Sequence, residues 1–394
     1  MDVKVLITGL GAVSTLGSGV EAFRRGLRAA DSLPVETADP WADVPVKRMY
    51  LVPDTVMAPP HGRVSAFAVQ AAEEAMADAG LEPASLDGSR TAVIVGTTIG
   101  DGADDERYGA AGASTDGSSA YGVSAAVAAA VGARGPAAVV GNACAASGYA
   151  VAMAADLIRS GAADVVVAGG AEAQSRVALA CFNRMGAVDP ERCRPFDAER
   201  RGTVFGEGAA VLVLESAEHV RRRGAPDRGY AEVGGSGWSC DAHHITSPEP
   251  GGEQIRRAMA EALEEAGIGA GDVGCVVPHG TGTELNDTVE SEALAHLLDE
   301  RLADTPLYSL KALIGHTGGA AGAFAVLTGA LIAQAREVMP NARVRVADPR
   351  CPVWLPEDAP TPLDRPGVLV NAYGFGGNNI SIALLAADRQ EGGR

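Results

Sequence analysis

The stretch PAAVVGNACAASGYAVAMAADLIRSG, residues 136–161, passes from a short apolar strand through a sharp elbow into an alanine-rich helix. The stretch SLKALIGHTGGAAGAFAVLTGALIAQA, residues 309–335, follows a similar course, with a loop before a long helix of small residues. Cys144 lies at the first elbow and His316 at the second. Two such units indicate two related halves, although the identity between them is too low to establish a repeat.

The rest of the chain alternates in the same way between β-branched runs and helical stretches. Strands are predicted over 5–11, 91–97, 136–142, 164–170, 209–215, 230–237 and 272–277, helices over 64–80, 146–161 and 255–267, and a closing hairpin over 367–385. Strands separated by helices of about 10–15 residues predict a parallel or mixed sheet with helices on its faces. The series restarts after Ala225, so we expect an α/β chain with two halves, 1–225 and 226–394.

Composition narrows the functional class. The chain has 394 residues, of which 47% are hydrophobic and 21% charged, as in a globular protein. Its formal charge of −18 makes nucleic acid an unfavourable partner. Six cysteines without a C-x-x-C pair argue against a zinc ribbon or a disulfide scaffold and suit a reducing compartment. We therefore expect no metal, no other cofactor and no nucleic acid.

Two segments bear on membranes. The N-terminal MDVKVLITGLG leads directly into an expected strand, so we predict no signal peptide. Residues 312–335 contain one ionisable residue, His316, and are long enough to cross a bilayer. Glycines crowd this stretch and charged segments flank it, which favours a buried helix in a soluble core. We expect no membrane contact and a cytoplasmic location.

Cys144 and two histidines form a candidate catalytic set. The N-terminal amides of a helix lower a thiol pKa and can bind an oxyanion, so Cys144 fits a nucleophile, although a free cysteine is more often a small buried hydrophobe. His279 follows an apolar run in PHGTGTELNDTVE, and His316 precedes the long helix. Histidines beside glycine and threonine in loops favour contact with a substrate. The three residues together predict a Cys–His–His site.

At this point the motifs resemble the β-ketoacyl-acyl carrier protein synthases, the elongating condensing enzymes of the thiolase fold. The resemblance covers nearly the full length and rests on eight segments in order: ITGLGAVSTLG, ACAASG, AGGAEA, RPFDAERRGTVFGEGA, DAHHITSP, HGTGTELND, KALIGHTGGAAG and NAYGFGGNN. It implies a thiolase-like α/β fold with two pseudo-repeated halves in an αβαβα arrangement. It also implies a decarboxylative Claisen condensation.

The resemblance implies a role for each site residue. Cys144 would take the acyl chain, while His279 and His316 would donate to the thioester oxygen of a malonyl-type extender. The amides of Cys144 and Phe375 would hold the second oxyanion, and Phe375 would gate the acyl pocket. Lys311 would pair with Glu290 and set the protonation of the histidines. Thr246, Thr281 and Thr283 match positions that contact the pantetheine arm, and Arg200 matches one that meets the acyl carrier protein.

The sequence departs from the family pattern in two places. Arg201 and Thr203 stand where the family often has an acid and an aromatic, which puts the carrier-facing or extender-facing detail in doubt. Because the chain is so acidic, we predict a local basic patch at Arg200 and Arg201 for the acidic carrier. The segment from Gly100 to Gly132 is shorter than in fatty-acid elongating relatives, which indicates a different chain-length rule or partner subunit.

Several functions stay open. The composition and the shortened segment favour polyketide synthesis over primary fatty-acid elongation. A silent partner subunit of the chain-length-factor type would lack the nucleophile, whereas Cys144 is present. A thiolase or a priming synthase with a Cys–His–Asn set is disfavoured by the second histidine. The family resemblance implies a dimer, with itself or with a homologous subunit.

Overall fold

A computed structural model describes residues 3–39, 42–53, 62–102, 106, 119–225 and 229–387. Ten of the described strands form one sheet in the order β10-β13-β14-β9-β1-β8-β7-β5-β6, with β2 beside β1, and two short pairs, β3-β4 and β11-β12, lie outside it. The N-terminal strands are β1 (Val5–Ser14), β2 (Gly17–Ser18), β5 (Thr91–Gly96), β6 (Ala137–Val140), β7 (Val165–Glu172) and β8 (Gly208–Ser216). The C-terminal strands are β9 (Ala231–Cys240), β10 (Val273–Val277), β13 (Gly367–Gly374) and β14 (Asn378–Leu385).

The two halves of the sheet repeat one plan. In the N-terminal half β5 runs parallel to β7, β7 antiparallel to β8, and β8 antiparallel to β1. In the C-terminal half β10 runs parallel to β13, β13 antiparallel to β14, and β14 antiparallel to β9. The halves join where β1 meets β9. The expected α/β fold with two pseudo-repeated halves is confirmed, and the boundary at residue 225 stays a prediction.

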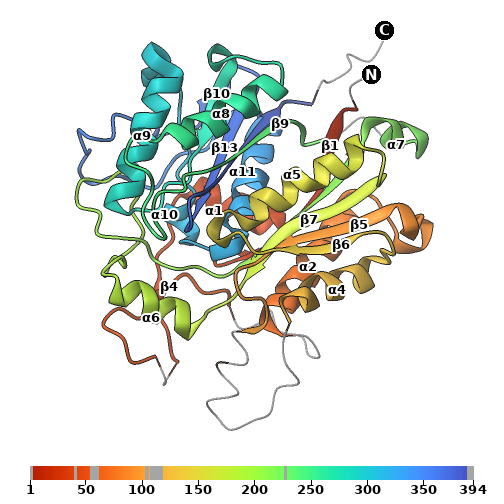
Figure 1. Ribbon diagram of the computed structural model, residues 1–394, viewed down its shortest axis with the longest axis horizontal. Coiled ribbons are helices and arrows are strands. Elements are labelled where there is room, and N and C mark those ends of the chain that lie inside the picture. Colours follow the sequence, from red (N-terminus) through yellow and green to blue (C-terminus); the bar gives the residue numbers. More distant parts are fainter. Residues whose placement is uncertain are drawn as a thin grey trace.

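Helices lie between and outside the half-sheets. The central pair is α5 (Ala146–Arg159) and α11 (Ala321–Ala335), which Figure 1 shows between the strands of the two halves. On the outer side of the N-terminal half, α2 (Arg63–Asp78) covers β1 and β8 and packs on α4 (Ala120–Val131). On the outer side of the C-terminal half, α8 (Glu253–Glu265) covers β9 and β14 and packs on α9 (Glu284–Leu298).

The remaining elements are short. They are α1 (Val20–Ala29), α6 (Arg176–Arg184), α7 (Ala217–Arg222), α10 (Lys311–Ile314) and the two-residue strands β3 (Val35–Glu36), β4 (Arg48–Met49), β11 (Glu337–Val338) and β12 (Thr361–Pro362). Single-turn 3-10 helices η3 (Ala143–Ala145) and η6 (Gly318–Ala320) immediately precede α5 and α11. The two central helices therefore start in the same way, each after a tight turn.

Small residues allow the central helices to touch. A Cβ atom on Gly322 of α11 would stand 2.4 Å from the backbone nitrogen of Gly148 in α5, so only glycine fits at this crossing. The segment Gly318–Ala335 is long and apolar enough to span a membrane, yet 89% of it is buried inside the protein. The prediction of a buried core helix is confirmed. The glycine- and serine-rich loop expected after Gly100 lies mostly outside the described residues.

Candidate active site

Cys144 lies at the turn that joins β6 to α5. The chain leaves β6 at Val140, makes the 3-10 turn η3 and enters α5 at Ala146. Ala143 has a φ of 49°, a left-handed conformation that is uncommon for a residue other than glycine and that sharpens the bend. The turn places Cys144 at the N-terminal end of α5, as the sequence predicted.

The end of β13 lies directly against this turn. A Cβ atom on Gly374 would stand 2.9 Å from the carbonyl oxygen of Asn142 and 3.2 Å from the backbone nitrogen of Cys144. This close approach brings the backbone N–H of the next residue, Phe375, to the Cys144 sulfur, where the N–H of Cys144 itself also points. Two backbone donors therefore converge beside the sulfur, which is the geometry that stabilises an oxyanion.

The Cys144 thiol is protonated at neutral pH. Burial raises its pKa to about 11, against the smaller opposing effects of the Lys311 charge and the two backbone amides. The backbone amides lower the thiol pKa, as expected at a helix N-terminus, but the loss of surrounding water outweighs them, so the net shift is upward. The thiolate therefore forms only as the reaction proceeds.

His279 and His316 lie together in the same cavity wall. His279 follows β10, and His316 lies in the turn between α10 and η6. Their ring centroids are 5.6 Å apart with an interplanar angle of 86°. The His316 turn is fixed on Val204 and Gly206 by backbone hydrogen bonds of 2.8 and 3.0 Å. The two rings thus occupy defined positions before any substrate arrives.

Both histidine rings are neutral. Burial, with the Lys311 charge as a second cause, lowers the pKa of His279 well below its usual value and that of His316 to about 3. Lys311 Nζ donates to the His279 carbonyl oxygen and lies 3.5 Å from His279 Nδ1. Burial also lowers the pKa of Lys311, and the Glu290 charge opposes this effect. With Lys311 donating to Nδ1, the neutral ring carries its proton on Nε2. Lys311 therefore leaves Nε2–H of His279 as the donor.

Glu290 supports the His279 loop and interacts electrostatically with Lys311. Its carboxylate accepts from the backbone N–H of His279 at 2.7 Å and of Gly280 at 2.8 Å, and from the Asn371 amide at 3.2 Å. The described ion pairs include no direct contact between Glu290 and Lys311, yet the Glu290 charge raises the Lys311 pKa against the lowering effect of burial, so the expected electrostatic pairing acts at longer range. Burial raises the pKa of Glu290 to about 7.

Most of the predicted site residues line one cavity of about 610 Å³. The candidates that line it are Cys144, Arg200, Thr246, Thr281, Thr283, His279, His316 and Phe375. Lys311 and Glu290 are buried and contact the His279 segment from behind. The cavity therefore joins a thiol, two backbone donors and two neutral imidazoles.

Phe375 lies over the cavity within a row of aromatic rings. It stacks on Phe182 of α6 with centroids 5.3 Å apart, and Phe182 meets Phe205 edge-on at 4.6 Å. Phe205 in turn stacks on His316 at 6.2 Å. This row ties the Phe375 loop to one of the histidines.

The three threonines lie along the cavity. The hydroxyls of Thr281 and Thr283 are 2.8 Å apart, and both residues belong to the loop between β10 and α9. Thr246 lies in the loop after β9, where its backbone N–H donates to His244 Nδ1 at 3.1 Å. These hydroxyls offer polar contacts along an otherwise mixed wall.

Arg200 does not lie on an open surface. Its guanidinium bonds to Asp348, lies 3.6 Å from Asp287 and is almost completely buried. The predicted basic patch at Arg200 and Arg201 was therefore wrong for Arg200, because two carboxylates neutralise it inside the protein. Arg201 is exposed and lies 3.5 Å from Glu191.

The sequence reading missed one buried carboxylate near the thiol. Glu172, at the end of β7, accepts from the backbone N–H of Thr98 at 2.8 Å and of Gly319 at 2.9 Å. It thereby ties the end of β5 to the turn that follows His316. Its signal was the acid directly after an apolar strand in the quoted motif AGGAEA. The described residues contain no His, Cys, Asp and Glu group arranged to hold a metal.

Comparison with known proteins points to the same kind of site as the geometry described above. The family model for the β-ketoacyl synthase N-terminal domain matches residues 56–219, and that for the C-terminal domain matches residues 230–345. The chain is 34% identical to 3-oxoacyl-[acyl-carrier-protein] synthase 2 of Rhizobium meliloti (strain 1021), over 97% of this chain and 98% of that protein. It is 33% identical to the tetracenomycin polyketide synthase ketoacyl synthase alpha subunit of Streptomyces glaucescens, over 98% of both chains.

Solved structures give the same picture. The ishigamide ketosynthase/chain length factor superposes with a TM-score of 0.90 at 34% identity, covering 98% of this chain and all of that one. A type II ketosynthase in complex with its acyl-carrier protein and bound to the hexaketide superposes with a TM-score of 0.89 at 28% identity, covering 98% and 100%.

Proposed function

We propose that Cys144 is the nucleophile of this chain, which belongs to the β-ketoacyl synthase family, and that the chain joins two acyl units by decarboxylative condensation. The chain is an acyltransferase of the condensing type. The observation that carries the proposal is one cavity in which two backbone N–H groups face the Cys144 sulfur and two neutral histidines lie beside it.

The first step loads the acyl chain. The Cys144 sulfur attacks the thioester carbonyl of an acyl group on the pantetheine arm of a carrier protein. The new bond to Cys144 forms, the bond to the pantetheine sulfur breaks, and the Cys144 proton leaves on the pantetheine thiol. The N–H groups of Cys144 and Phe375 hold the oxyanion that develops between these events.

The second step makes the carbon–carbon bond. A malonyl group on a second carrier arm loses carbon dioxide, and the electron pair of the broken bond passes to the thioester as an enolate. His279 and His316 donate to the enolate oxygen, and both can do so because they are neutral N–H donors at working pH. The α-carbon attacks the acyl-Cys144 carbonyl, and collapse of the tetrahedral intermediate expels the thiolate, which regains a proton.

The partners follow from this chemistry. We infer that an acyl carrier protein brings both substrates, with Thr246, Thr281 and Thr283 along the path of its arm. We also infer a dimer, with itself or with a homologous subunit, because the relatives include ketosynthase and chain-length-factor pairs. A cytoplasmic location is our expectation for a chain of this kind.

Polyketide assembly is the pathway we favour, and fatty-acid elongation is the alternative. The curated relatives include enzymes of both kinds at similar identity. A silent chain-length-factor role is disfavoured by the complete thiol and histidine set. Comparing saturated and β-keto acyl primers in one condensation assay separates the first two pathways.

The test of the proposed function is the release of carbon dioxide from malonyl-carrier protein by His279→Ala and His316→Ala. Each substitution should slow release by about 10²–10³-fold, since each removes one donor to a developing charge. His296→Ala, which alters an exposed histidine of α9, is the matched control and should keep the normal rate. Unimpaired release by both site variants would contradict the proposal.

A further inference from the structure

We propose that the carrier protein docks over the cavity mouth through an apolar rim formed by Met185, Ile245 and Leu285, rather than through a basic patch. This inference rests on the proposed function, because it names how the partner of that same site is held. Arg200 is buried against two carboxylates and only Arg201 of the predicted patch is exposed, so an apolar contact is the alternative that the structure offers.

The apolar rim comes from three separate segments. Met185 ends α6, Leu285 lies in the first turn of α9, and Ile245 belongs to the loop after β9. Met185 and Leu285 line the cavity and are 45% and 58% exposed, while Ile245 is 77% exposed and directly precedes the lining residue Thr246. Large apolar side chains this exposed around one opening are typical of an interaction surface.

The Ile245 segment is tied to the catalytic loop. The carbonyl oxygen of Ile245 accepts from the backbone N–H of Gly376 at 2.9 Å, one residue after Phe375. The Ile245 side chain projects into solvent from this fixed backbone. A protein seated on Ile245 would therefore rest on the loop that carries one of the two oxyanion donors.

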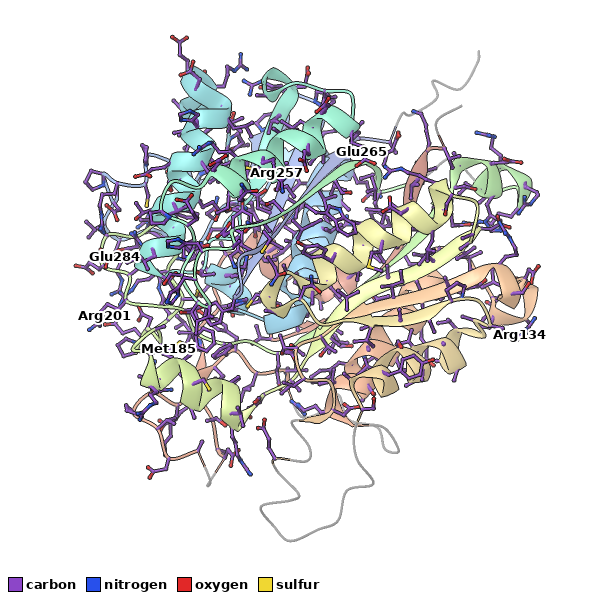
Figure 2. All side chains as sticks on the ribbon, viewed as in Figure 1. Arg134, Met185, Arg201, Arg257, Glu265 and Glu284 are labelled. Atoms are coloured by element: carbon purple, nitrogen blue, oxygen red, sulfur yellow. The ribbon has the colours of Figure 1, made fainter. Side chains whose placement is uncertain are left out.

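Two of the charges at the mouth, those of Arg201 and Glu284, have an opposite charge beside them. Arg201 lies 3.5 Å from Glu191, and Glu284, beside Leu285, lies 2.7 Å from Arg350. Figure 2 shows Met185, Arg201 and Glu284 on one side of the molecule, and all three line the cavity. The opposite charge beside Arg201 and beside Glu284 reduces the field that a third charge meets.

The occupant is fixed by the cavity and by the charge of the chain. A thioester on a pantetheine arm reaches Cys144 through this mouth, so the body of its carrier has to sit on the rim. The net charge of −18 gives an acidic carrier no long-range attraction, and this favours contacts that do not depend on opposite charge. A second copy of this chain on the rim would close the mouth to the arm.

The experiment compares two substrates for each variant. One is malonyl on a holo acyl carrier protein of a type II polyketide system, and the other is malonyl-pantetheine without the protein. The readout is the ratio of kcat/KM for the carrier substrate to kcat/KM for malonyl-pantetheine. Changes confined to the arm tunnel or to folding lower both values and leave the ratio unchanged.

Ile245→Glu and Leu285→Glu should each lower this ratio about tenfold, as expected when an apolar contact near the centre of an interface is replaced by a charge that repels an acidic partner. Arg201→Glu should change it less than threefold. Leu33→Glu, at a 61% exposed position that does not line the cavity, and Arg134→Glu, on the opposite side in Figure 2, should leave it unchanged.

Varying the salt concentration is a second experiment, and it tests the unaltered chain without reversing any charge. For the unaltered chain, the ratio should vary less than threefold between about 50 and 500 mM salt, since apolar contacts are not screened. A ratio that falls more than tenfold with salt or in Arg201→Glu would overturn the apolar rim in favour of a basic patch. A ratio unchanged in both rim variants would also overturn it. Loss of condensation between an acyl primer and malonyl-pantetheine in Cys144→Ala is the separate check on the proposed function.

Discussion

Replacing Lys311 with methionine removes the two contacts that this buried amino group makes with His279. Lys311 Nζ donates to the His279 carbonyl and lies 3.5 Å from His279 Nδ1. Methionine fills a similar volume without a charge, so the substitution removes the donor without opening a cavity. The substitution leaves the buried His279 carbonyl without its donor, so we expect the free energy of unfolding to fall by about 1–3 kcal/mol.

The expected catalytic loss follows from the contacts. The bond to the carbonyl holds the His279 segment, and the long contact to Nδ1 contributes less, so we count one charged hydrogen bond of about 1.5–3 kcal/mol. If the whole of this hydrogen-bond energy is lost from the transition state, malonyl decarboxylation slows by roughly 10- to 150-fold. The assay is carbon dioxide release from malonyl-carrier protein at saturating substrate, with the melting temperature as control.

Nitrogen-15 NMR of histidine provides an independent readout. In the unaltered protein His279 should carry its proton on Nε2, because Nδ1 accepts from Lys311 Nζ. In Lys311→Met the ring should become a mixture of tautomers. The Lys311 charge also lowers the pKa of both histidines, so its loss should move the His316 titration upward from about 3. Less than twofold loss of rate with an unchanged tautomer would refute this reasoning.

Three further predictions concern the same fold. Because the pKa of Cys144 is about 11, its alkylation by iodoacetamide should accelerate about tenfold per pH unit from about pH 7 to 10. A plateau of the rate below about pH 9 would contradict a thiol pKa this high. Gly374→Ala should abolish condensation because its Cβ would meet the turn at Cys144, whereas Gly122→Ala, where a Cβ meets nothing within 4 Å, should stay active. Asp348→Asn should lower the free energy of unfolding by up to about 3 kcal/mol in urea titrations, since the Arg200 guanidinium stays buried but loses one carboxylate partner. An unchanged free energy of unfolding would show that this ion pair is dispensable.

The parts of the fold that the sequence predicted are those set by local pattern. Apolar runs bounded by glycine marked the main strands, and the two elbows at Cys144 and His316 marked the repeated halves. Because both halves have the same strand order, their elbows and the end of β10 meet in one place, which brings His279 to the thiol. The Cys–His–His grouping could therefore be predicted without coordinates.

The errors concern side chains whose surroundings come from distant segments. The spacing of Lys311 and His316 identifies a motif, yet it does not reveal that Lys311 donates a hydrogen bond to the His279 carbonyl. Arg200 was expected at the surface, but Asp348, far along the chain, buries and neutralises it. The upward net shift of the thiol pKa could not be predicted for the same reason, because the loss of water around Cys144 depends on the whole fold.

The most direct test of the central claim is intact mass spectrometry of the chain after incubation with an acyl-loaded carrier protein. The chain should gain the mass of one acyl group, and hydroxylamine should remove it as expected for a thioester. Cys144→Ala should gain nothing, whereas replacement of the exposed Cys181 by alanine should load normally. Acyl loading that survives in Cys144→Ala would contradict Cys144 as the nucleophile.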